Sequence, residues 1–144
     1  MDIPAVIRLG VSLQRGAVYR FIDPALHTAP HYYVVLNVDP KADTVLVLCI
    51  ATSQVGKAQS RVALRRQNPG TIVVIQVEDT TVFPRKSAFD CNSVYSVSPE
   101  ELAQKINASR ISSMDMVLEE DLVNRIVAGV HLSDVVAGEL KELL

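Results

Sequence analysis

Three arginine side chains, Arg61, Arg65 and Arg66, fall within one six-residue stretch of the 144-residue chain, and Arg85 and Lys86 form a second basic pair. A guanidinium group can donate two parallel hydrogen bonds to a phosphate, and an ammonium group attracts phosphate as a point charge. These five residues are therefore candidate contacts for a phosphate-bearing ligand. The same residue types are also typical of a solvated surface loop.

The overall charge of the chain does not favour a polyanionic partner. The formal net charge is -2, and affinity for nucleic acid rests on summed Lys and Arg contacts to phosphate. Aromatic residues make up only 5% of the chain and Trp is absent, so few side chains are available to stack on bases. We expect any binding to nucleic acid to depend on a local basic patch.

His31 is the main candidate for proton transfer. An imidazole with an ordinary pKa near 6.5 exists in both protonation states close to neutral pH, so it can act as an acid or as a base. The alternative is a loop histidine that merely caps a strand. His27, in the same loop, is a weaker candidate, and His131 is expected to be structural.

Several kinds of chemistry find no support in the sequence. Cys49 and Cys91 are expected to be buried thiols, and without a C-x-x-C motif or a His/Cys cluster we expect no metal and no cofactor. No glycine-rich phosphate loop, G-x-S-x-G motif or pair of catalytic carboxylates is present.

The apolar runs are too short to cross a bilayer, and the N-terminus lacks the features of a signal peptide. We therefore expect a cytoplasmic protein without membrane contacts.

The first half of the chain predicts a Val-rich antiparallel sheet. Segments 16–22, 32–38, 44–51 and 71–77 are rich in β-branched or apolar residues and lie between turn signals. The second and third of these, joined by a short turn, give the firmest hairpin. The polar, basic stretch 52–70 is interpreted as a long loop, a kind of segment that often carries function.

The last third of the chain predicts helices. Ser98, Pro99 and Glu101 form a capping box with proline at the first helical position, ahead of a helix over 100–107. Apolar residues from Leu118 to Val130 recur at steps of three and four, which indicates an amphipathic helix ending near Gly129. A third helix is expected from residue 133 to about 143, which would make a helical hairpin. Residues 1–14 are expected to form an apolar leader, either a short helix or an arm packed on the barrel.

Residues 83–102 give the most informative order of elements. A basic pair and a serine precede a short strand, a turn, a second short strand and the capped helix. Together with Arg15-Gly16 before the first strand and Thr52-Ser53 at the end of the third, this order resembles the MazF/PemK-like toxins. The resemblance covers about residues 15–106. It implies a small antiparallel barrel of the SH3-like kind, and for many members a single-strand-specific endoribonuclease activity. With the helices that the last third of the chain predicts, we expect a mainly β fold with C-terminal helices.

The resemblance also implies a metal-independent reaction in which the 2′-hydroxyl of the RNA attacks the adjacent phosphate. Such a reaction needs a proton acceptor, a proton donor and a cation. The chain departs from the family at Ala17, where an acidic residue is usual, and at Pro30 or His31, where an arginine opens the second strand. We therefore predict a catalytic group of His31, Thr52 and Ser53, and RNA contacts from Arg61, Arg65, Arg66, Arg85 and Lys86.

Two functional hypotheses follow. The first is a toxin of a toxin–antitoxin system that cleaves single-stranded RNA selectively, with a cognate antitoxin-like protein and a second copy of itself as partners. The second is a non-catalytic barrel that binds a protein partner, or binds RNA without cleaving it. In either case we expect a barrel with its first capped helix over residues 1–107, and a helical hairpin over 108–144 packed on the same domain.

Overall fold

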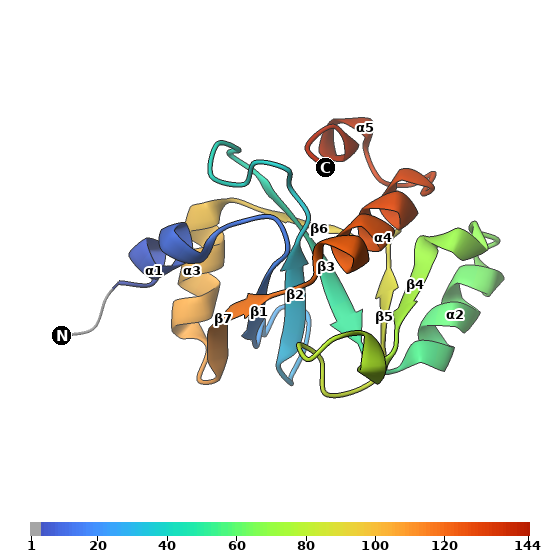
Figure 1. The fold of residues 1–144 in the computed structure, drawn as a ribbon, viewed down its shortest axis with the longest axis horizontal. Helices are drawn as coiled ribbons and strands as arrows, with labels where there is room; N and C mark the ends of the chain where they lie inside the picture. The colour runs from blue at the N-terminus through green and yellow to red at the C-terminus, as the bar shows by residue number, and fades with distance from the viewer. Residues whose placement is uncertain (1–3) are drawn as a thin grey trace.

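The computed structural model describes residues 4–144, in which one bent antiparallel sheet carries helices on both faces (Figure 1). The elements are, in chain order, α1 (Ala5–Ser12), β1 (Ala17–Phe21), β2 (His31–Val35), β3 (Leu46–Thr52), α2 (Val55–Leu64), η1 (Pro69–Thr71), β4 (Ile72–Ile75), η2 (Val77–Asp79), β5 (Ser87–Asp90), β6 (Tyr95–Val97), α3 (Pro99–Ala108), β7 (Ser112–Val117), α4 (Glu120–His131) and α5 (Gly138–Lys141).

The strands follow the order β4-β5-β3-β2-β1-β7, and β6 also pairs with β3. β3 is the longest strand and is shared by β2, β5 and β6, so the sheet bends around it. The expected small, mainly antiparallel fold with C-terminal helices is confirmed. The barrel is open, because within residues 4–144 the outer strands β4 and β7 do not pair with each other.

The predicted hairpin of β2 and β3 is confirmed, and Asn37 fixes its turn. The Asn37 side-chain oxygen accepts a hydrogen bond from the Val47 amide at 2.7 Å. Its amide nitrogen donates to the Asp43 carboxylate and to the Val45 carbonyl, both at 2.9 Å. A buried polar side chain is stable only when its hydrogen bonds are made, so Asn37 specifies this turn.

The Arg15-Gly16 pair has a structural role in this chain. Gly16 has a φ of 85°, and a Cβ there would lie 3.0 Å from the Leu118 carbonyl oxygen. Arg15 donates to the Leu36 carbonyl at 2.6 Å and to the Asn124 side chain at 3.3 Å. The pair thus joins the start of β1 to the end of β2 and to α4.

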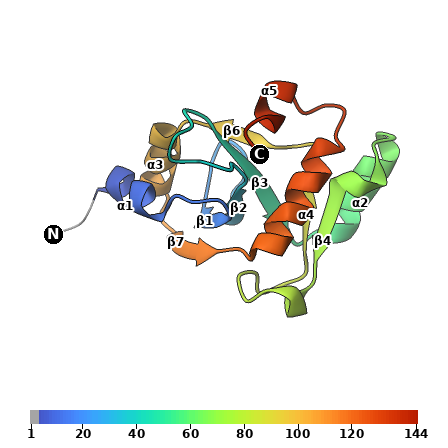
Figure 2. The same cartoon turned by 45° about the horizontal axis from the view of Figure 1, so that its top comes forward.

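Two apolar cores lie on opposite faces of the sheet. Figure 2 shows α1 and α3 on one side of the sheet and α4 on the other. α1 and α3 cover one face, where Tyr19, Phe21 and Tyr33 are fully buried. α4 covers the other face, and its apolar stripe has the predicted helical spacing. The buried residues of this stripe are Leu122, Val123, Ile126, Val127 and Val130.

The end of the chain differs from the prediction. The third helix expected from residue 133 is only the single turn α5, and the Ser133 hydroxyl instead accepts hydrogen bonds from the Val135 and Val136 amides. Gly129 does not end α4, which continues to His131. Strand β7 was not predicted, and it pairs with β1. The division of the chain at residue 107 stays a prediction. β7 lies after this residue and pairs with β1, which lies before it, so the sheet contains strands from both sides of the division.

Both other helix predictions are close to the observed structure. In the leader, α1 buries Leu9 and is followed by buried Leu13, while residues 1–3 lie outside the described part. α3 begins after Ser98, whose hydroxyl accepts from the Glu101 amide at 3.1 Å. Among residues 4–144, no helix has the length and apolar character that crossing a membrane requires.

Candidate functional site

A cleft of about 930 Å³ opens where β2 begins and β3 ends. Residues 27–30 of the loop between β1 and β2 form one side, and α2 contributes Arg61 and Arg65 to another. The loop before β5 adds Pro84 and Arg85. In Figure 1 the start of β2, the end of β3 and the start of α2 all lie at the lower side of the molecule.

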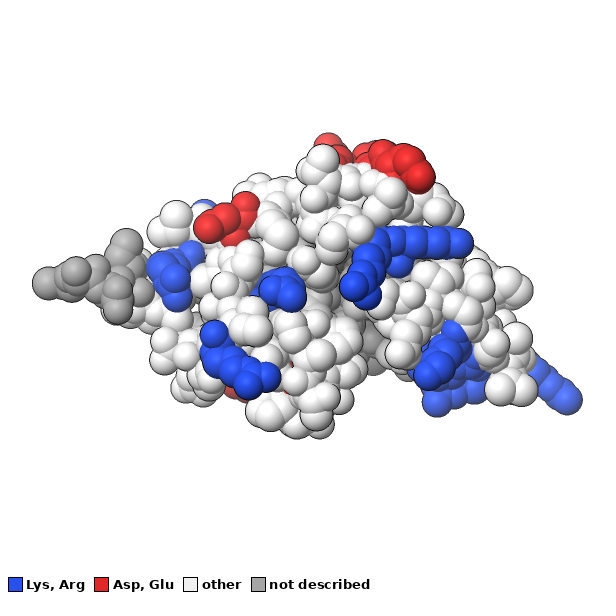
Figure 3. Space-filling model, turned by 90° about the horizontal axis from the view of Figure 1, so that it is seen from below, with Lys and Arg blue, Asp and Glu red and all other residues white. Residues whose placement is uncertain are grey.

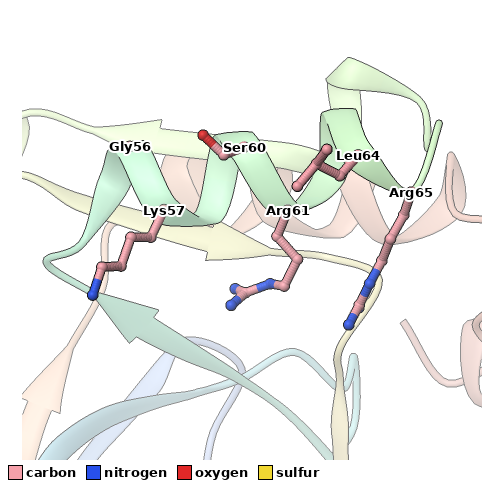
Figure 4. Close-up of a pocket in the computed structure, with 6 residues that line it drawn as sticks. All are labelled: Gly56, Lys57, Ser60, Arg61, Leu64 and Arg65. Atoms are coloured by element: carbon pink, nitrogen blue, oxygen red, sulfur yellow. The ribbon is translucent and has the colours of Figure 1, made fainter.

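The prediction of a loop over residues 52–70 is wrong, because α2 occupies most of it. Ala58 and Val62, four residues apart, are the buried residues of this helix. Lys57, Arg61 and Arg65 also follow at steps of four, and their side chains extend from one side of α2 (Figure 4). They line a smaller hollow of about 490 Å³ that shares Arg61 and Arg65 with the cleft.

Six of the eight predicted site residues line the cleft. They are His31, Thr52, Ser53, Arg61, Arg65 and Arg85. Arg66 and Lys86 are exposed and lie outside its lining. Arg66 follows the end of α2 with a φ of 53°, so it leaves the ridge that Arg61 and Arg65 share.

His31 is the first residue of β2 and pairs with Phe21 of β1. Tyr33 pairs with Ile50, and continuing this register by two residues places Thr52 across from His31. The His31 Nδ1 atom lies 3.0 Å from the Ala29 carbonyl oxygen. Because a carbonyl only accepts, Nδ1 carries the hydrogen in this contact, and Nε2 is left to exchange a proton.

Thr52 lies at the junction of β3 and α2. Its hydroxyl oxygen accepts a hydrogen bond from the Gln54 amide at 3.1 Å, which orients the hydroxyl and leaves its hydrogen for an acceptor in the cleft. Ser53 is exposed beside it. The first turn of α2 has no acidic residue, so its backbone amides keep their partial positive charge at this end of the cleft.

Arg20 of β1 also lines the cleft and was missed by the sequence reasoning. Its guanidinium carbon lies 5.6 Å from the centre of the Tyr32 ring. Its Nε atom is buried and has no hydrogen-bond partner among the described residues. The available signal was that Arg20 is the one charged residue in a strand whose other members are all buried.

A buried carboxylate, Asp90, holds Arg61 in place. The Arg61 Nε atom lies 3.6 Å from one Asp90 oxygen. The other oxygen accepts from the Asn92 amide at 3.0 Å and from the Asn92 side chain at 3.1 Å. Arg61 is therefore partly neutralised by the protein, whereas Arg65 has no ion pair among residues 4–144.

The histidine-bearing loop is anchored by Asp23. This buried carboxylate accepts hydrogen bonds from the Tyr95 hydroxyl at 2.9 Å and the Ala25 amide at 3.1 Å, and lies 3.1 Å from the Lys105 ammonium group of α3. Burial alone would raise the pKa of Asp23, but these donors outweigh it and hold the pKa below its usual value. The loop is thus fixed to the body of the protein at its first turn.

Both cysteines are buried free thiols, as predicted. A hydrogen bond with Cys91 and burial raise the pKa of Cys49 well above its ordinary value, so that thiol stays protonated at neutral pH. Neither cysteine lines the cleft. Within residues 4–144, no group of three or more His, Cys, Asp or Glu side chains is placed to hold a metal ion.

Figure 3 views the molecule from the side on which β2 begins and β3 ends. Lys and Arg side chains are more prominent than Asp and Glu on this face, and one basic group gathers at the α2 end. Since the chain as a whole carries a formal charge of -2, the basic character is local. This agrees with the expectation that phosphate contacts depend on a patch.

Comparison with known proteins supports the fold. No protein-family model matches the sequence, and no curated protein shows a significant sequence match. A solved structure of an endoribonuclease in complex with its cognate antitoxin, from a mycobacterial species, matches with a TM-score of 0.50 over 82% of this chain and 90% of that chain. The identity is 12%, so the match establishes a shared fold. The expected structural resemblance to the MazF/PemK-like toxins is confirmed at that level.

Proposed function

We propose that this protein is an RNA-cleaving toxin of the toxin–antitoxin type, acting on single-stranded RNA through the 2′-hydroxyl of the substrate. One observation carries the proposal. A histidine, a strand-end threonine and arginines from separate segments converge on a single cleft, in a fold shared with an endoribonuclease.

Each group has a role that its geometry allows. His31 exchanges a proton through Nε2 with one of the reacting oxygens, since Nδ1 is engaged by the Ala29 carbonyl. The Thr52 hydroxyl donates to the phosphate, and Ser53 stands beside it. Arg61, Arg65 and Arg85 supply positive charge for the phosphate backbone and for the negative charge that develops in the transition state.

The proposed partners follow from the same cleft. Its arginine lining favours an acidic segment of an antitoxin-like protein, which would compete with RNA for the same groups. The structural neighbour is itself in complex with a cognate antitoxin. We further propose a homodimer and a cytoplasmic location.

A second candidate function rests on a specific departure from the family. The position at which active members open their second strand with an arginine is filled here by Pro30 or His31, and the usual acidic residue after Arg15-Gly16 is Ala17. A protein that has lost catalysis would keep the cleft and bind RNA or a protein partner without cleaving it. An assay for RNA cleavage by the purified protein separates the two.

Purified protein is expected to cleave a pool of single-stranded RNA and to leave 2′,3′-cyclic phosphate ends and 5′-hydroxyl ends. Cleavage should persist in EDTA, because the proposed acid, base and cation are all side chains. DNA of the same sequence is the control, since it lacks the attacking hydroxyl and should remain intact. Binding of RNA with no cleavage at any pH from 5 to 9 would replace the proposal with the non-catalytic one.

Arg65 and Arg66 allow a matched test of the cleft. Arg65→Gln removes a phosphate contact, so the slope of log affinity against log salt should fall by about 0.7 for a single strand. Arg66→Gln changes the charge equally but lies outside the cleft, so its slope should equal that of the wild type. Affinity for a 2′-deoxy oligonucleotide, measured over a salt series, supplies both slopes. Equal slopes in the two variants would assign Arg65 to the solvated surface.

A further inference from the structure

The imidazole rings of His27 and His31 are stacked, with their centres 3.8 Å apart and their planes inclined by 27°. Both rings line the cleft and both are partly exposed to it. His27 lies in the loop that buried Asp23 anchors at one end, and this loop leads into β2, whose first residue is His31. The pair is therefore a fixed feature of the cleft rather than two independent side chains.

Cleavage through the 2′-hydroxyl needs two proton transfers at two oxygens. The attacking O2′ and the leaving O5′ occupy the two ends of the five-coordinate phosphorane, separated by about two phosphorus–oxygen bonds. Two imidazoles stacked 3.8 Å apart present their ring edges at a comparable spacing. One ring can thus face each reacting oxygen if the phosphate lies along the edge of the stack.

We propose that His27 is a second catalytic residue, and that His27 and His31 act as a base and acid pair on the same phosphate. This inference rests on the proposed ribonuclease function. Neutral His27 takes the proton of the 2′-hydroxyl, and O2′ forms a bond to phosphorus. The bond from phosphorus to O5′ breaks, and O5′ takes a proton from protonated His31. The products are a 2′,3′-cyclic phosphate and a 5′-hydroxyl, with one proton moved from His31 to His27 overall.

The surroundings assign the roles in this direction. Burial lowers the pKa of His27, neighbouring His31 lowers it further, and the Asp23 carboxylate opposes them only in part. Two stacked imidazolium ions repel each other, and the lowered pKa of His27 favours its neutral form, which is the form that a base requires. The other charged groups that line the cleft around the pair are Arg20 from β1, Arg61 and Arg65 from α2, Arg85 from the loop before β5, and Asp90 at the end of β5.

His27→Asn is expected to lower the single-turnover rate of cleavage by ~10²-fold or more. The His27→Asn variant should also lose the part of the pH–rate profile in which the rate rises with pH, because that rise reflects the formation of neutral His27. The His31→Asn variant should lose the part in which the rate falls with pH, because the acid must carry its proton. Unfolding midpoints and affinity for a 2′-deoxy oligonucleotide, measured on both variants, identify any loss that comes from misfolding, and His27→Gln then repeats the test with a different side chain.

A substrate with sulfur in place of the bridging O5′ separates the acid from the base. A thiolate leaves without a proton, so this substrate should restore most of the rate lost in His31→Asn and little of that lost in His27→Asn. Wild-type rates in His27→Asn and His27→Gln would overturn the inference while leaving the ribonuclease proposal standing. Equal rescue of both histidine variants would overturn the assigned roles. A wild-type protein that cleaves no RNA would overturn the proposed function, and this inference with it.

Discussion

His31→Asn is expected to reduce the rate constant for RNA cleavage by ~10²–10⁴-fold while leaving affinity for RNA nearly unchanged. Proton transfer to or from a reacting oxygen contributes to the transition state and not to the bound ground state, so kcat falls and KM stays close to its wild-type value. Asparagine retains a planar polar side chain but cannot exchange a proton near neutral pH. Single-turnover cleavage at saturating protein gives the rate constant, and a 2′-deoxy oligonucleotide gives the affinity.

His131→Asn is the matched control for this prediction. His131 is exposed at the end of α4 and does not line the cleft, so the same substitution should leave the rate unchanged. If His31→Asn cleaves as fast as His131→Asn, His31 is not a proton-transfer residue. A parallel loss of affinity would instead mean that His31 positions the RNA.

The parts of the fold that the sequence predicts well are those with strong local signals. The hairpin of β2 and β3 combines β-branched strands with a short turn, and α3 has both a serine cap and a proline at its first position. In each case the residues that specify the structure are close together in the sequence. Local patterns also place Thr52 at a strand end and His31 at a strand start.

α2 and β7 were missed because each buries only one or two side chains, so neither shows a clear apolar pattern in the sequence. α2 buries only Ala58 and Val62, and half of its other residues are polar or charged, so its composition resembles that of a loop. β7 is an outer strand with Met114 as its one buried residue, and serine and aspartate are weak strand formers. The third helix was predicted too long because Ser133 has the side chain of a helix cap. Its hydroxyl does accept hydrogen bonds from the Val135 and Val136 amides, but the residues after it do not continue as a helix.

The composition of the cleft required the tertiary structure. Arg20 reaches it from β1, far in the sequence from the basic stretch of α2, and no local pattern links the two. The positive φ of Arg66, just beyond the end of α2, separates it from Arg65, so the two residues are adjacent in the sequence but differ in whether they line the cleft. The stacking of His27 on His31 depends on the path of an irregular loop, which residue types alone do not specify.

Gly129→Val is expected to lower the free energy of unfolding by about 1–3 kcal/mol, a large part of the ~5–15 kcal/mol typical of a natural domain. Gly129 lies inside α4 where this helix packs on the sheet. A Cβ there would lie 2.7 Å from the Cys91 sulfur and 3.2 Å from a methyl group of Val73. Urea unfolding should show a lower midpoint with an unchanged slope.

Gly10→Val is the control, since Gly10 is also helical but a Cβ at that position meets no atom within 4 Å. Valine has a higher helix propensity than glycine, so this variant should be as stable as the wild type or slightly more stable. The clash itself can be tested by combining Gly129→Val with Cys91→Ala, which removes the sulfur atom nearest to the new side chain. If the clash is the cause, the double variant loses less stability than the sum of the two single losses. A simple sum would mean that Val73 and the backbone, rather than Cys91, set how closely α4 approaches the sheet.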